Sequence, residues 1–232
     1  MNDSFMALLD EVIRWFADPA HWQGSTGIPA YTLEHAGYML ISIAIGAAIA
    51  LPIGIGLGHS GRGGLLAINL TNIGRAVPAF GVIIFVFLLV GYGLVPVIVA
   101  LVALAIPPMV TNSYVGMREV DPAVRQAAKA LGMTGWQRLW RVELPIATPL
   151  IMAGVRTSAV QVMSTATLAA YVGLGGLGRY LIDGLQLRDM AQVLVGAILV
   201  ALLAIVTELV FALLQRLVTA RGLRVRGDSS YS

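Results

Sequence analysis

Long apolar runs without a charged residue dominate the chain. The longest holds 42 positions, from 76 to 117, between Arg75 and Arg118. As a helix, 42 residues would measure about 63 Å, roughly twice the hydrocarbon thickness of a bilayer. The run is therefore expected to cross a membrane twice, and Gly91-Tyr92-Gly93 supplies the tight turn that two neighbouring spans need.

Five segments are long and apolar enough to cross as helices, which predicts an all-α integral membrane protein. We place the spans at about 34–58, 65–91, 94–115, 146–172 and 190–214. Prolines in these segments are expected to kink the helices: Pro52, Pro78, Pro96, Pro107 and Pro108. Gly54 and Gly58 form a G-x-x-x-G pair, which either permits close helix packing or reflects chance in a glycine-rich chain.

Residues 1–33 are expected to precede the five-span domain, which we place at 34–215. Apolar residues at helical spacing predict an amphipathic helix that lies in the outer membrane–water interface: Phe5, Leu8, Leu9, Val12, Ile13 and Phe16. No basic region precedes them, unlike in a signal peptide. A turn-rich connector follows, from Asp18-Pro19 to Pro29.

Composition agrees with a membrane protein, since the hydrophobic residues make up 58% of the chain and the charged ones only 12%. The absence of cysteine excludes a disulfide-stapled fold. Most Lys and Arg residues fall in segments on one side of the five spans: Arg62, Arg118, Arg125, Lys129, Arg138, Arg141, Arg216, Arg221, Arg224 and Arg226. The positive-inside rule then places the amino terminus outside and the basic tail, 216–232, in the cytoplasm.

The segment 118–145 is the one sizeable polar piece on the predicted cytoplasmic side. Asp121 and Pro122 can begin a short helix that ends at Gly132. Its small residues would share one face, with Arg125 and Lys129 pointing away: Ala123, Ala127, Ala130 and Leu131. Thr134-x-x-Gln137 predicts a capping box for a second helix through Trp140, before Leu144-Pro145 begins the next span. Such a helix could dock into a groove of another protein, or be only a well-capped loop.

The spacing in this segment resembles a known family. Gln126-Ala127-Ala128, three residues, Gly132, nine residues, Val142, one residue and Leu144-Pro145 resemble the EAA loop of permease subunits of binding-protein-dependent ABC importers. Further stretches resemble the branch that imports osmoprotectants such as glycine betaine, choline or carnitine: 120–122, 133–137, 142–145, 151–157, 166–170 and 175–178.

The resemblance implies a type I ABC importer permease that works by alternating access in a bacterial or archaeal cytoplasmic membrane. Its implied partners are a second permease, identical or homologous, a cytoplasmic ABC ATPase dimer and an extracytoplasmic binding protein. The ATPase would bind ATP and Mg, so this chain would bind no cofactor and would not be an enzyme. The coupling residues would be Gln126, Ala127, Ala128, Gly132, Leu144 and Pro145. Gln126 replaces the usual acidic residue, which puts a charge-dependent contact in doubt.

Several residues are candidates for the pathway or a gate: Arg75, Gln161, Ser164, Thr165, Gly175, Gly176 and Gly178. Gly173-x-Gly175-x-x-Gly178 also matches a dinucleotide fingerprint, but no strand precedes it, so an outer loop or gate fits better. Arg75, Arg156 and Glu208 lie in predicted spans, where a charge pair is favoured over a substrate contact. The histidines are scattered, and we expect no metal site, no catalytic residue and no nucleic acid partner.

Three other functions stay open. Within the same class, the solute could be another small molecule, with methionine the nearest alternative. An ion-coupled secondary transporter is a different class, which would usually show an internal repeat, and the chain shows no convincing one. A membrane-embedded enzyme is the weakest alternative, because no catalytic set of side chains stands at membrane depth.

Overall fold

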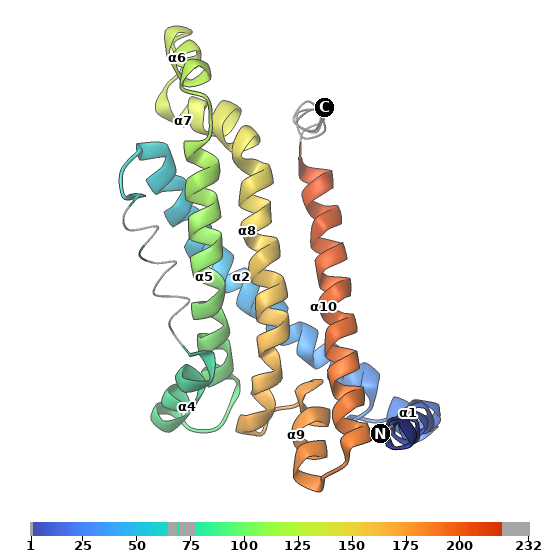
Figure 1. The fold of residues 1–232 in the computed structure, drawn as a ribbon. Coiled ribbons are helices and arrows are strands. Elements are labelled where there is room, and N and C mark those ends of the chain that lie inside the picture. The colour runs from blue at the N-terminus through green and yellow to red at the C-terminus, as the bar shows by residue number, and fades with distance from the viewer. Residues whose placement is uncertain (1, 65–68, 70–77, 220–232) are drawn as a thin grey trace. The chain divides into compact units, whose positions relative to one another are not determined.

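The computed structural model describes residues 2–64, 69 and 78–219, and every regular element in this part is helical (Figure 1). The elements are α1 (Asn2–Ala17), η1 (Pro19–Trp22), α2 (Ile28–Ser60), α4 (Ala79–Val90), α5 (Leu94–Arg118), α6 (Pro122–Ala130), α7 (Gly135–Arg138), η2 (Leu139–Glu143), α8 (Leu144–Thr165), η3 (Ala166–Val172), α9 (Gly178–Leu187) and α10 (Met190–Val218). The all-α fold class is confirmed.

Four helical stretches in the described residues are long and apolar enough to cross a membrane: Ile28–Ser60, Leu94–Arg118, Gly135–Val172 and Met190–Val218. They contain the first, third, fourth and fifth predicted spans. Of the second predicted span, 65–91, the structure describes the 12-residue helix α4, whereas 65–68 and 70–77 lie outside the described residues. The predicted turn at 91–93 is confirmed, because α4 ends at Val90 and Gly91 has a φ of 81°.

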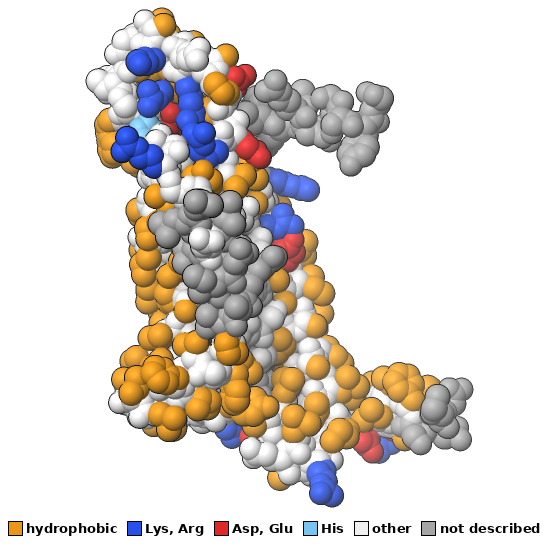
Figure 2. All heavy atoms as spheres, turned by 60° about the vertical axis from the view of Figure 1, so that its left-hand side comes forward, with side chains coloured by type: hydrophobic (Ala, Val, Ile, Leu, Met, Phe, Trp, Pro, Cys, Tyr) orange, Lys and Arg blue, Asp and Glu red, His pale blue; other side chains and the backbone are white. Residues whose placement is uncertain are grey.

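The chain divides into two compact units, and α2, α5, α8 and α10 each contribute residues to both. The first unit comprises 1–42, 77–102 and 160–207, and the second comprises 43–76, 103–159 and 208–232. Many large apolar side chains on these long helices are exposed, among them Leu33, Leu213 and Leu217. Figure 2 shows such side chains covering the flanks of the helices, which suits contact with lipid.

In the first unit, α1 packs on protein rather than lying wholly in an interface. Val12 is buried against Ala191 and Val195 at the start of α10. Phe5 and Ile13, on the same predicted apolar face, stay exposed. The prediction of an amphipathic helix is thus confirmed, but one edge of its apolar face is already covered by the neighbouring helix.

In the second unit, α2 and α5 pack closely at the G-x-x-x-G pair. A Cβ at Gly54 would lie 2.6 Å from the Val110 carbonyl oxygen and 2.7 Å from the Ser113 Cβ atom. Gly58 faces Met117 in the same way. These distances are too short for a side chain, so the spacing serves helix approach and is not chance.

Gly54→Ala should destabilise the subunit by about 1–3 kcal/mol, because the added methyl group forces the two backbones apart. The matched control is Gly56→Ala, two residues along the same helix, where an added Cβ meets nothing within 4 Å. Thermal unfolding of the purified variants in mild detergent measures the difference. Equal melting temperatures for the two variants would contradict the close packing.

Candidate functional site

The helix α6 forms where the sequence supplies both end signals. The Asp121 carboxylate accepts a hydrogen bond of 2.8 Å from the Ala123 amide, and Pro122 occupies the first turn. At the other end, the Gly132 amide donates to the Lys129 carbonyl at 3.0 Å with a φ of 78°, which only glycine adopts readily. In Figure 1, α6 and α7 lie at the end of the second unit where α5 stops and α8 begins.

The structure separates the predicted coupling residues into exposed and buried ones. Gln126, Ala127 and Gly132 are exposed, and the Leu131 side chain beside them is 80% exposed. Ala128 is only 5% exposed and faces the unit. Leu144 is half-buried and Pro145 exposed in the first turn of α8. The exposed residues of α6 are therefore mostly small or apolar, together with the Gln126 amide and the charged Lys129.

The capping box of α7 is confirmed. The Thr134 hydroxyl accepts from the Gln137 amide at 3.3 Å, and the Gln137 side chain accepts from the Thr134 amide at 2.9 Å. The next span begins at Leu144, as expected, and the π-helical turn η2 joins α7 to it without a loop.

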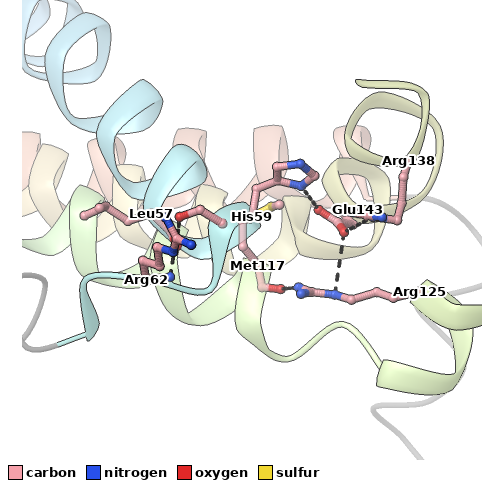
Figure 3. A network of polar contacts seen from close by, with 8 residues as sticks. Leu57, His59, Arg62, Met117, Arg125, Arg138 and Glu143 are labelled. Carbon is pink, nitrogen blue, oxygen red and sulfur yellow. Dashed lines mark hydrogen bonds and ion pairs between the residues drawn. The ribbon is translucent and has the colours of Figure 1, made fainter. Parts of the chain in front are cut away.

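A buried carboxylate lies beneath α6, and no pattern in the sequence singled it out. Glu143 is fully buried and accepts a hydrogen bond of 2.5 Å from Nδ1 of His59 and one of 2.9 Å from Nε of Arg138 (Figure 3). Nε of Arg125 lies 3.6 Å from the same carboxylate. The feature of the sequence that could have pointed to Glu143 is a single acidic residue before an apolar span, in a segment that contains several arginines.

Arg125 points away from the small-residue face of α6, as expected, and that direction leads into the protein. Its guanidinium turns inward toward Glu143 and donates a hydrogen bond to the Met117 carbonyl at the end of α5. A buried carboxylate attracts the nearest cation more strongly than water does once the site is closed. Lys129, by contrast, is exposed as expected.

The surroundings of Glu143 favour its ionised form. Hydrogen bonds from His59 and Arg138 and the nearby cation of Arg125 all stabilise a negative charge on this carboxylate. Figure 2 shows the Lys and Arg side chains gathered around an acidic and a histidine side chain at this end of the second unit.

The charges predicted within the spans form a pair. The guanidinium of Arg156 donates to Glu208 and, at 3.3 Å, to the side-chain oxygen of Gln215, so α8 and α10 are joined. This confirms a structural pair for Arg156. Arg75 lies outside the described residues, so its role stays a prediction.

The glycine-rich candidates lie in the first unit and are tightly packed rather than loose. The Gly176 amide donates to Glu34 at 3.0 Å, and the Tyr38 hydroxyl donates to the same carboxylate at 2.5 Å. A Cβ at Gly175 would overlap Glu34, and one at Gly178 would overlap the Thr167 backbone.

The polar candidates at the end of α8 do not join this cluster. Gln161 and Ser164 are exposed, and Thr165 is half-buried. The Ser164 hydroxyl donates to the Val160 carbonyl one turn earlier, at 3.0 Å.

Comparison with known families accounts for this arrangement. Residues 42–221 match the family described as the binding-protein-dependent transport system inner membrane component. The chain belongs to this family. It is therefore a transport component of a membrane, as the resemblance to permeases of binding-protein-dependent importers implied.

Named relatives match most of the chain. The glycine betaine/carnitine/choline transport system permease protein OpuCB of Bacillus subtilis (strain 168) is 38% identical over 193 residues, 83% of this chain and 89% of that protein. The carnitine transport permease protein OpuCB of Listeria monocytogenes is 34% identical over 216 residues, 93% of this chain and 97% of that protein. The osmoprotectant import permease protein OsmW of Salmonella typhimurium is 32% identical over 210 residues, 84% of this chain and 98% of that protein.

Solved structures show the same fold. An inward-facing structure of the MetNI methionine ABC transporter matches with a TM-score of 0.70 and 23% identity, over 88% of this chain and 99% of that chain. An amino acid ABC transporter matches with a TM-score of 0.63 and 19% identity, over 82% of this chain and 91% of that chain. At these identities the likeness concerns the fold alone.

Proposed function

We propose that this chain is the permease subunit of an ATP-driven importer of osmoprotectants that carry a quaternary ammonium group, such as glycine betaine, choline and carnitine. The observation that carries the proposal is 38% identity with a glycine betaine/carnitine/choline permease over 83% of the chain. The methionine alternative has only a likeness of fold behind it, at 23% identity.

The proposed motor is a separate pair of ABC ATPases that binds ATP and Mg, and this chain supplies the surface they grip. The exposed side of α6 suits that role, because Ala127 and Gly132 leave room for a groove to close around the helix. Gln126 can only contribute a hydrogen bond or a steric fit, since it carries no charge. Leu144 and Pro145 would pass the movement into α8.

The remaining parts of the importer follow the same scheme. Two permease subunits would form the pathway, and an extracytoplasmic binding protein would deliver the solute at the end opposite to α6. The basic residues near α6 favour a cytoplasmic location for it. Gly175, Gly176 and Gly178 would form part of the outer gate, where Glu34 accepts from the Gly176 amide and from the Tyr38 hydroxyl. Gln161, Ser164 and Thr165, at the neighbouring end of α8, would belong to the same gate.

The test is solute uptake by the complete importer in proteoliposomes. We expect ATP-dependent uptake of labelled glycine betaine, choline or carnitine, and none of labelled methionine under the same conditions. Omission of the ATPase should abolish uptake, which separates this mechanism from an ion-coupled one. Methionine uptake without osmoprotectant uptake, or uptake that persists without the ATPase, would overturn the proposal.

A further inference from the structure

Five segments of the second unit meet at one carboxylate. Glu143, at the end of η2, receives His59 from the end of α2, Arg138 from α7 and Arg125 from α6. Arg125 also holds the Met117 carbonyl at the end of α5. The side chains of His59, Arg125 and Arg138 are each at least three-quarters buried, at 24%, 19% and 23% exposed.

The helix α6 has little else to hold it. Within α6, which the structure describes completely, Ala128 is the one buried residue, and its single methyl group offers a small contact area. The helix is otherwise tied through the backbone at its two ends. The side-chain link from α6 to the long helices therefore depends on Arg125, which faces the Glu143 carboxylate and donates to the Met117 carbonyl.

A buried carboxylate with several cationic partners resists deformation. Removal of its charge leaves Arg125 and Arg138 together without an anion, and uncompensated buried charge is strongly unfavourable. Arg125 would then be held by the Met117 carbonyl without a charged partner, and α6 would be fixed less firmly. Loss of one donor costs less, because the remaining donors still satisfy the carboxylate.

We propose that Glu143 is a positioning residue that fastens α6 to α2, α5 and α8, so that a displacement of α6 moves these helices together. The proposal rests on the proposed function only for the source of that displacement, which is the ATPase. Glu143 itself contacts neither solute nor ATP in this role. Without it, the ATPase would still grip α6, but part of the movement would be lost before it reached the long helices.

The first test measures the link directly and needs no solute. The chain has no cysteine, so Ser60→Cys and Lys129→Cys introduce the only two spin-label sites, both exposed, beside His59 and on α6. Double electron–electron resonance on the spin-labelled full chain in lipid nanodiscs should give a narrow distribution of distances between the two labels. Glu143→Gln should broaden it, whereas Glu119→Gln, which removes an exposed carboxylate before α6, should leave it narrow.

A second variant covers the case in which Glu143→Gln fails to accumulate. His59→Ala removes the donor from α2 while Arg125 and Arg138 still pair with the carboxylate. We expect it to broaden the same distance distribution, by less than Glu143→Gln. A distribution as narrow as that of the Glu119→Gln control in either variant would overturn the role of Glu143.

The second test measures coupling in the reconstituted importer. We expect the importer that carries Glu143→Gln to hydrolyse several times more ATP per solute molecule imported than the importers with the parent subunit or with Glu119→Gln. The ATPase should still bind all three. A merely structural residue would lower hydrolysis and uptake in proportion, and an unchanged ratio would contradict the proposal. Should the parent import no osmoprotectant, the proposed function fails, while the spin-label distances still decide the role of Glu143.

Discussion

Ala127→Trp should abolish osmoprotectant uptake while the subunit still inserts and folds. Ala127 is exposed at the middle of α6, so the indole meets no neighbour within its own chain, but it occupies the space that the ATPase groove needs. Loss of a central, well-packed contact costs about 2 kcal/mol or more, which lowers binding more than tenfold. Uptake in proteoliposomes and co-purification of the ATPase measure the two effects.

The matched control is Lys129→Trp, which adds the same indole to α6 about 200° around the helix from Ala127. Lys129 is exposed as well, so folding is equally unaffected, and uptake should stay close to that of the parent. If Ala127→Trp transports normally, or if both variants lose uptake alike, the exposed side of α6 around Ala127 is not the gripped surface.

The residues of α6 and α7 were predictable because their signals are local. Asp121, Pro122 and Gly132 mark helix ends by rules that need no tertiary contact, and Thr134 with Gln137 does the same. The apolar lengths of the spans are equally local, which explains why four of the five predicted spans have clear counterparts in the structure. The second span depends partly on residues outside the described part of the chain.

The inward turn of Arg125 was not predictable from its own helix. Periodicity placed it away from the small-residue face, but the carboxylate that attracts it lies 18 positions further along the chain, and His59 lies 84 positions before that carboxylate. A pattern within α6 carries no information about such distant partners. The start of α8 was predictable for the opposite reason, because Pro145 is a local signal that fits the first turn of a helix.

The glycine-rich segment 175–178 shows how one pattern can have several uses. The sequence indicated a turn or a gate, and both require glycine for its conformational freedom. The structure adds a second reason, since the Glu34 carboxylate lies where a side chain at Gly175 would be. That contact joins segments 142 positions apart and could not be inferred from the glycine spacing.

Glu208→Leu should deplete the folded subunit in the membrane several-fold, and Arg156→Leu combined with it should restore the amount. The single change leaves Arg156 without its carboxylate partner between α8 and α10, and an unpaired cation in a span is expensive. Replacement of both members by leucine removes that cost, because a paired charge is often no more stable than apolar side chains of similar size. Quantitative immunoblots of membrane fractions and melting in mild detergent measure both variants.

The membrane levels and uptake rates of the parent, the Glu208→Leu variant and the double variant distinguish a structural pair from a functional one. If the pair is structural, the double variant accumulates like the parent and imports solute at a comparable rate. Gln215, which accepts from Arg156 and donates to the Pro149 carbonyl, stays in place and keeps α8 tied to α10 in the double variant. A double variant that accumulates fully but imports nothing would instead assign Arg156 or Glu208 to the transport pathway and contradict a purely structural pair.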